Sequence, residues 1–319
     1  MQNILDPAIL FFVFGVLAGC LKSNLEIPPA ISRFLSLYLL MALGLKGGFA
    51  LEKSGLTSEV GAGLGAALCL ALLVPILGYS ILKRFLNGFD AAAIAATYGS
   101  VSAVTFVTAT QYLEHQKIDF GGHMSAAMAL MESPAIIMAV MLANTLRSTS
   151  DSTTTATSIK KILHESFTDG AQLLLIGAMV VGLLTGESGK AAMQPFSGDL
   201  FKGMLSFFLL DMGLMTARNL PQVKGQSPWL IAYAVIAPLA HATVALGMAS
   251  ALELSQGDTT LLMVLAASAS YIAVPAVLRY AISEANPFLY FGLSLGVTFP
   301  LNILFGIPLY SYIAQSAVK

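Results

Sequence analysis

The chain has 319 residues, of which 56% are hydrophobic and only 10% are charged. A soluble globular domain carries about 25% charged residues. This composition therefore excludes a soluble globular protein and predicts an all-α integral membrane protein with many spans. The net charge of −1 and the lack of a basic tract give no support for binding to nucleic acid.

Ten apolar segments predict membrane-spanning helices, because a helix needs about 20 apolar residues to cross the hydrocarbon core. Their ends are marked by charged residues, Gly and Pro. The start, Met1–Asp6, lacks the basic region and the cleavage site of a signal peptide, so the first span is predicted to be retained. In chain order the ten spans lie near residues 7–22, 29–51, 57–83, 90–113, 123–146, 164–185, 200–218, 227–252, 259–282 and 288–315.

A Ser/Thr-rich stretch at residues 147–163 predicts a flexible linker between two halves of five spans each, 1–146 and 164–319. Five is an odd number, so the halves enter the membrane from opposite sides, as inverted repeats do. Short matches recur in the same order at a nearly constant offset. They pair Leu39–Leu45 with Phe208–Leu214, Gly99–Ser102 with Ala267–Ser270, and Met131–Pro134 with Val297–Pro300.

The distribution of Lys and Arg predicts the orientation, because these residues are retained on the cytoplasmic side. With the N-terminus outside, the inner loops and span ends hold more Lys and Arg than the outer ones. We therefore expect both termini outside and the linker in the cytoplasm.

Small hydroxyl residues gather at the middle of spans four and nine, at corresponding places in the two halves. If both helices break there, their free N–H groups and hydroxyls would bind a small anion, because helix N-termini carry partial positive charge. The alternative is that small residues only allow close helix packing. The candidate substrate-binding residues are Gly99, Ser100, Ser102, Thr105, Ser268, Ala269, Ser270 and Tyr271.

Oxygen-bearing side chains within other spans are candidate ligands of a coupling cation. Glu132 precedes Ser133-Pro134 in span five, and a mid-membrane carboxylate is a functional candidate by default; a structural, hydrogen-bonded role is its alternative. Asp211 in span seven could bind a cation, relay a proton or pair with Arg279. The candidate cation ligands are Glu132, Asp211, Thr298 and Asn302.

Other features predict no catalytic chemistry. Cys20 and Cys69 lie in apolar runs without metal-ligand spacing. The sequence contains no nucleophile elbow, zinc-protease motif or phosphate-binding loop, so it does not predict an enzyme.

Several short segments, in this order and spacing, resemble the cyanobacterial-type sodium-dependent bicarbonate transporter family over nearly the whole chain except the linker. The segments are Ile27–Ser32, Gly44–Gly48, Gly99–Ser102, Pro134-Ala135, Ala143-Asn144, Ile236–Pro238, Ala266–Ser270, Ser283–Pro287 and Ile307–Leu309.

The resemblance implies ten spans in two inverted five-helix repeats, with a core domain moving against a gate domain and each domain built from both repeats. It implies a homotrimer within the membrane lipid of a bacterial inner membrane. It further implies Na⁺-coupled uptake of bicarbonate, with the anion held where the two broken helices cross. A PII-like regulatory protein binding from the cytoplasm is also implied.

The chain departs from the family pattern at its candidate sites. Tyr271 stands where the family has Asp, and Val104 and Ala269 each replace a Ser. Glu132 keeps the carboxylate that the family carries as Asp, whereas Asp211 has no expected counterpart and would compensate for Tyr271. The linker is also shorter than in the cyanobacterial proteins.

The sequence thus favours a sodium-coupled symporter of a small anion, with bicarbonate as the first candidate. Two alternatives remain open. One is a transporter of another small anion, such as a carboxylate. The other is a membrane receptor or assembly partner that keeps the scaffold without transporting.

Overall fold

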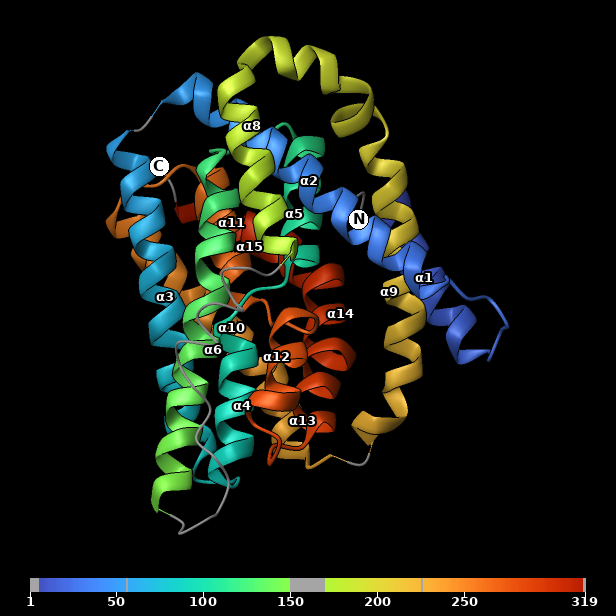
Figure 1. Ribbon diagram of the computed structural model, residues 1–319, viewed down its shortest axis with the longest axis vertical. Coiled ribbons are helices and arrows are strands. Elements are labelled where there is room, and N and C mark those ends of the chain that lie inside the picture. Colours follow the sequence, from blue (N-terminus) through green and yellow to red (C-terminus); the bar gives the residue numbers. More distant parts are fainter. Residues whose placement is uncertain (1–5, 56, 150–169, 225, 318–319) are drawn as a thin grey trace.

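The computed structural model describes residues 6–55, 57–149, 170–224 and 226–317, and within these residues it contains helices and no strands (Figure 1). The first half of the chain contributes α1 (Pro7–Cys20), α2 (Pro29–Ser54), α3 (Ser58–Leu82), α4 (Gly88–Gly99), α5 (Ala103–Gln116) and α6 (His123–Thr149). The second half contributes α8 (Gly170–Met193), η2 (Gln194–Asp199), α9 (Phe201–Lys224), α10 (Pro228–Ala251), α11 (Gln256–Ala267), α12 (Ala273–Ala281), α13 (Pro287–Leu293), η3 (Ser294–Thr298), α14 (Phe299–Leu301), η4 (Asn302–Gly306) and α15 (Ile307–Ala317).

Seven helical runs among the described residues are long and apolar enough to cross a membrane, so the chain is a multi-pass membrane protein. The count is lower than the predicted ten for identifiable reasons. Helix α1 has only 14 residues, α11 and α12 have 12 and 9, and α8 and α9 fall in one run, Gly170–Pro221. Ten spans therefore remain a prediction.

One predicted boundary is wrong, because helix α6 continues to Thr149 and includes Arg147, where the linker is predicted to start. The predicted end of span six at residue 185 coincides with a kink in α8. Gly186 there has non-helical backbone angles (φ 52°, ψ −139°), which separate the helix before it from the helix that runs on to Met193. The rest of the predicted linker and the predicted start of span six at residue 164 lie outside the described residues.

Helices α1, α2, α8 and α9 pack on one another through glycines and, together with η2, form what we call the peripheral bundle (Figure 1). A Cβ atom added at Gly48 of α2 would lie 2.1 Å from the carbonyl oxygen of Met179 in α8. One added at Gly213 of α9 would lie 2.2 Å from the carbonyl oxygen of Phe12 in α1. These contacts bring backbones together as small residues do in membranes.

The remaining helices form a second group, the broken-helix bundle, in which α3 packs on α4 and α6 while α10 packs on α11. The helices α4 and α11 begin in the same way. The Asp90 carboxylate accepts a hydrogen bond from the Asn286 N–H (2.7 Å), and the Asp258 carboxylate accepts one from the Gly121 N–H (2.6 Å). Helix α4 of the first half is thereby joined to the loop before α13 in the second half. Helix α11 of the second half is joined in the same way to the loop before α6 in the first half.

Candidate functional site

Both predicted helix breaks are present. Helix α4 ends at Gly99 and α5 starts at Ala103, while α11 ends at Ala267 and α12 starts at Ala273. Serine side chains in both intervals offer the backbone alternative hydrogen bonds. Pro275 lies in the first turn of α12, where a missing N–H costs little.

A serine satisfies the first turn of the helix that follows each break. The Ser102 hydroxyl accepts a hydrogen bond from the Thr105 N–H at 3.2 Å. The Ser270 hydroxyl accepts one from the Val274 N–H, also at 3.2 Å. The N-termini of α5 and α12, with their partial positive charge, therefore both lie at the breaks.

The two breaks contact each other directly. The Ser270 N–H donates to the Thr97 carbonyl at 2.8 Å, and the Ser102 N–H donates to the Ser268 hydroxyl at 3.0 Å. The Ser268 hydroxyl in turn donates to the Leu265 carbonyl at 2.9 Å. Segments far apart in the sequence thus form one hydrogen-bonded centre.

A cavity of about 60 Å³ lies beside this centre, between the two bundles. A single water molecule needs about 10–15 Å³ by this measure, so the cavity has room for a small ion. Four of the predicted site residues line it, namely Ser102, Ser270, Tyr271 and Glu132.

The other predicted substrate residues surround the breaks without lining this cavity. Gly99 allows α4 to pack on α3, since an added Cβ would lie 2.6 Å from the Pro75 ring. The Ser100 hydroxyl donates to the backbone carbonyl of Glu132 at 3.4 Å. The residues in this group are Gly99, Ser100, Thr105, Ser268 and Ala269.

Glu132 is held by a residue that sequence reasoning did not single out. Its Oε2 accepts a hydrogen bond from Gln172 Nε2 of α8 at 2.8 Å. Gln172 and Ser36 of α2 line the cavity from the peripheral bundle. Little signal in the sequence marks either residue, because Gln172 follows the polar run at residues 164–169 and Ser36 follows Ser32-Arg33.

Asp211 lies outside the cavity lining. It is 5% exposed, its Oδ2 has no hydrogen-bond partner, and the Ser32 side chain of α2 lies within hydrogen-bonding reach of the carboxyl group. Among the described residues, Asp211 forms no ion pair with Arg279. The structure therefore does not bring Asp211 together with Glu132 at one cavity.

Thr298 and Asn302 hold helices together. The Thr298 hydroxyl donates to the Ala234 carbonyl at 2.8 Å and lies 2.7 Å from the Tyr98 hydroxyl. The Asn302 amide donates to the Ala267 carbonyl at the end of α11, at 2.8 Å. Neither residue lines the cavity of Glu132.

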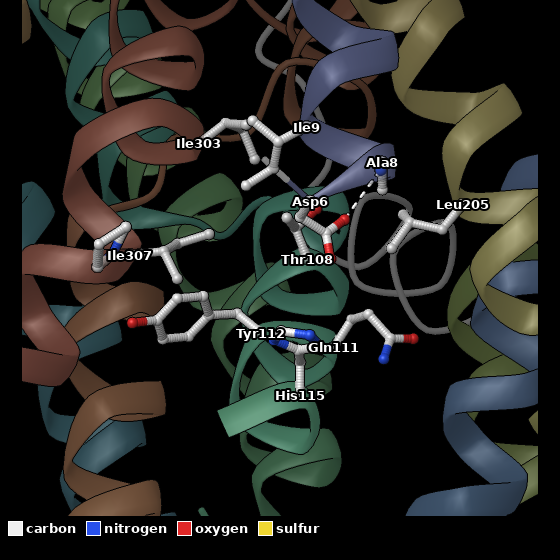
Figure 2. A pocket seen from close by; sticks show the side chains of 11 residues that line it. Asp6, Ala8, Ile9, Thr108, Gln111, Tyr112, His115, Leu205, Ile303 and Ile307 are labelled. Carbon is white, nitrogen blue, oxygen red and sulfur yellow. Dashed lines mark hydrogen bonds between the residues drawn. The ribbon is translucent and has the colours of Figure 1, made fainter. Parts of the chain in front are cut away.

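A smaller cavity, of about 20 Å³, lies elsewhere between the bundles (Figure 2). Its lining includes Asp6 beside α1, Leu205 of α9, and Thr108 and His115 of α5. None of the predicted site residues lines it, so it does not compete with the centre at the breaks as the candidate site.

The helical membrane architecture, with a polar cavity where two helices are interrupted, is typical of a secondary transporter. The family model of the Na⁺-dependent bicarbonate transporter superfamily matches residues 7–315, and the chain belongs to that superfamily. No curated protein matches the chain. The resemblance found in the sequence is thereby confirmed.

Proposed function

We propose that this protein is a Na⁺-coupled symporter of a small anion, with bicarbonate as its substrate. The observation that carries the proposal is the convergence of two helix N-termini, those of α5 and α12, on the cavity that Glu132 lines, each with a serine hydroxyl bonded to its first turn. One group of atoms suits an anion, and the carboxylate beside it suits a cation.

The anion would bind to backbone N–H groups and to the hydroxyls of Ser102, Ser270 and Tyr271. Among the described residues that line the cavity there is no Lys or Arg. A site that relies on dipoles without a full positive charge favours a small monovalent anion over a divalent one. Bicarbonate and a small monocarboxylate both meet this criterion, and the superfamily favours bicarbonate.

The cation would bind at Glu132, because hard cations take carboxylate, carbonyl and hydroxyl oxygens. The Ser100 hydroxyl donates to the backbone carbonyl of the same residue at 3.4 Å and so supports its position beside the breaks. Asp211 remains a second candidate. Thr298 and Asn302 are better explained as structural residues, because their polar atoms are engaged with neighbouring helices.

Transport would proceed by elevator-type alternating access, with the broken-helix bundle as the core and the peripheral bundle as the gate. Ten spans in two inverted repeats would supply both bundles. The reciprocal bonds of Asp90 and Asp258 support this symmetry, since each links a half-helix to the opposite half. The resemblance extends the proposal to a homotrimer in a bacterial inner membrane, with both termini outside and a PII-like regulator at the cytoplasmic linker.

The experiment is uptake of labelled bicarbonate into proteoliposomes, with an inward Na⁺ gradient or an equal choline gradient. Uptake stimulated by Na⁺ is the expected result. Uptake that ignores Na⁺ would contradict sodium coupling. If labelled acetate or another monocarboxylate is taken up and bicarbonate is not, bicarbonate is not the substrate, while the assignment of the site to a small anion still holds. The absence of any uptake would favour a non-transporting role.

A further inference from the structure

The cavity lies where the two bundles meet, and the hydrogen bond between Gln172 and Glu132 joins them there. Ser36 of α2 and Gln172 of α8 belong to the peripheral bundle, whereas Glu132 belongs to α6 of the broken-helix bundle. The bond from Gln172 Nε2 to Glu132 Oε2 measures 2.8 Å. Gln172 is 6% exposed, so little bulk water is available to replace the carboxylate as the acceptor for its amide.

This bond engages the atoms that a cation would need. An amide N–H and a metal ion both bind to the lone pairs of a carboxylate, and a hydrogen bond to the charged oxygen is a strong one. A cation that approaches Glu132 from the cavity therefore competes with the Gln172 amide for the same group.

We propose that Gln172 is a positioning residue that acts through Glu132. It joins the two bundles while Glu132 holds no cation, and Na⁺ displaces it. The inference rests on the proposed sodium coupling and deepens it. It names Gln172 as the residue whose release, when a cation binds to Glu132, loosens the interface between the two bundles beside the cavity.

The test is Na⁺-dependent thermal unfolding of the purified full-length protein, with choline chloride keeping the ionic strength constant. Ligands that bind the folded state raise Tm, so the wild type should show a Na⁺-specific increase. Gln172→Met keeps a similar side-chain shape without the donor. In this variant, the Na⁺ concentration that gives half of the increase in Tm should be lower by about fivefold or more. Fivefold is the lower end of the changes in affinity that coupled sites typically cause in each other.

A matched control is Gln194→Met, which removes an amide–carboxylate bond within the peripheral bundle, from Gln194 Nε2 to Asp199 Oδ1 at 3.0 Å. That bond lies away from the cavity of Glu132. The control should leave the half-effect Na⁺ concentration unchanged. A role of Gln172 in stability alone would lower Tm in choline without moving that concentration.

The outcomes separate the inference from the function. An unshifted half-effect concentration in Gln172→Met overturns the inference and leaves sodium coupling intact. The lack of a Na⁺-specific increase in the wild type overturns sodium coupling, and the inference falls with it. If Gln172→Met does not fold, Gln172→Asn takes its place, because the Asn side chain is one methylene shorter and its amide lies farther from Glu132. The same shift in the half-effect Na⁺ concentration is expected for it, and an unshifted value overturns the inference.

Discussion

Two carboxylates that are alike in sequence lie in different surroundings. Glu132 lines the cavity at the breaks and accepts a hydrogen bond from Gln172. Asp211 is almost completely buried, with one oxygen that has no hydrogen-bond partner. Because a charge at this depth is costly without compensation, contact with a cavity that an ion can enter distinguishes Glu132 as the better cation ligand.

We expect Glu132→Gln to abolish Na⁺ stimulation of uptake, because the neutral amide cannot replace the charge that a cation requires. The loss should be about tenfold or more, at least as large as the effect of removing a group that only supports a metal ligand. The measurement is initial uptake against Na⁺ concentration in proteoliposomes. Glu187→Gln, at an exposed position beside Lys190, is the control, and normal Na⁺ activation of Glu132→Gln would remove this residue from the site.

We expect Ser102→Ala and Ser270→Ala each to raise the substrate concentration for half-maximal uptake about threefold to tenfold. Each hydroxyl accepts a hydrogen bond from the first turn of a helix, and a bond of this kind contributes about 1 kcal/mol to the order of the N-terminus. Ser206→Ala is the control, since its hydroxyl donates to the Lys202 carbonyl inside α9. Half-maximal concentrations equal to the wild type in both variants would place the substrate elsewhere.

Among the helical elements, the crossing of α2 and α8 depends on the absence of a side chain. We expect Gly48→Ala to lower the free energy of unfolding by about 1–3 kcal/mol, the range for overpacking a closely packed site, because the new Cβ would meet the Met179 carbonyl. Gly177→Ala on α8 is the matched control, since beyond the nearby backbone of α8 itself no atom lies within 4 Å of its added Cβ.

The measurement is the Tm of both variants in the same detergent. Gly177→Ala should match or slightly exceed the wild type, because alanine favours helix more than glycine does. Equal values of Tm for Gly48→Ala and Gly177→Ala would contradict the close approach of the two helices.

The end of α6 is fixed by an ion pair. The Arg147 guanidinium donates from Nε and Nη2 to the two oxygens of Glu284, each at 2.7 Å, and from Nη2 to the Ala281 carbonyl at 3.0 Å. The hydrogen bonds from Arg147 hold the pKa of Glu284 below its ordinary value. The pair thereby joins α6 to the loop between α12 and α13.

This pair predicts a pH dependence. Because the pKa of Glu284 is lower in the folded state, its contribution to stability is complete above about pH 4.3, the ordinary glutamate value, and is lost as the pH falls through the lowered pKa. The wild type should therefore lose Tm below that pH, and Glu284→Gln should lose less over the same range.

The control for this prediction is Glu187→Gln, which removes the exposed pair with Lys190 at 3.7 Å. Exposed pairs contribute little to stability, so this variant should follow the wild-type curve. A profile for Glu284→Gln that is parallel to the wild type would contradict the stabilising role of the Arg147 pair.

The elements differ in how far the sequence could reveal them. The breaks near Ser102 and Ser270 could be predicted because a dense cluster of hydroxyl residues is a local signal. The partner of Glu132 could not, because Gln172 belongs to a different half and meets it only through tertiary packing. Asp90 and Asp258 were missed for the same reason, since an Asp near a span end is typical of an ordinary helix start.

At the scale of the molecule, the proposed mechanism requires the two bundles to move against each other. Two ion pairs allow a test of this motion, because one joins the two bundles and the other lies within a single bundle. Lys46 of α2 pairs with Glu114 of α5 at 2.9 Å across the bundles, beside a cavity of about 650 Å³. Lys202 of α9 pairs with Asp6 beside α1 at 2.8 Å within the peripheral bundle.

We therefore expect Lys46→Cys with Glu114→Cys, joined by a short bis-maleimide, to lose uptake, because the link fixes one bundle to the other. Lys202→Cys with Asp6→Cys, joined by the same reagent, should keep it. Both are made after the native Cys20 and Cys69 are replaced by Ser, since both are exposed. Uptake is measured before and after linking, with the linked fraction read from mass spectrometry of proteolytic fragments. Full uptake by a completely linked Lys46–Glu114 pair would show that transport needs no relative movement of the bundles at this interface.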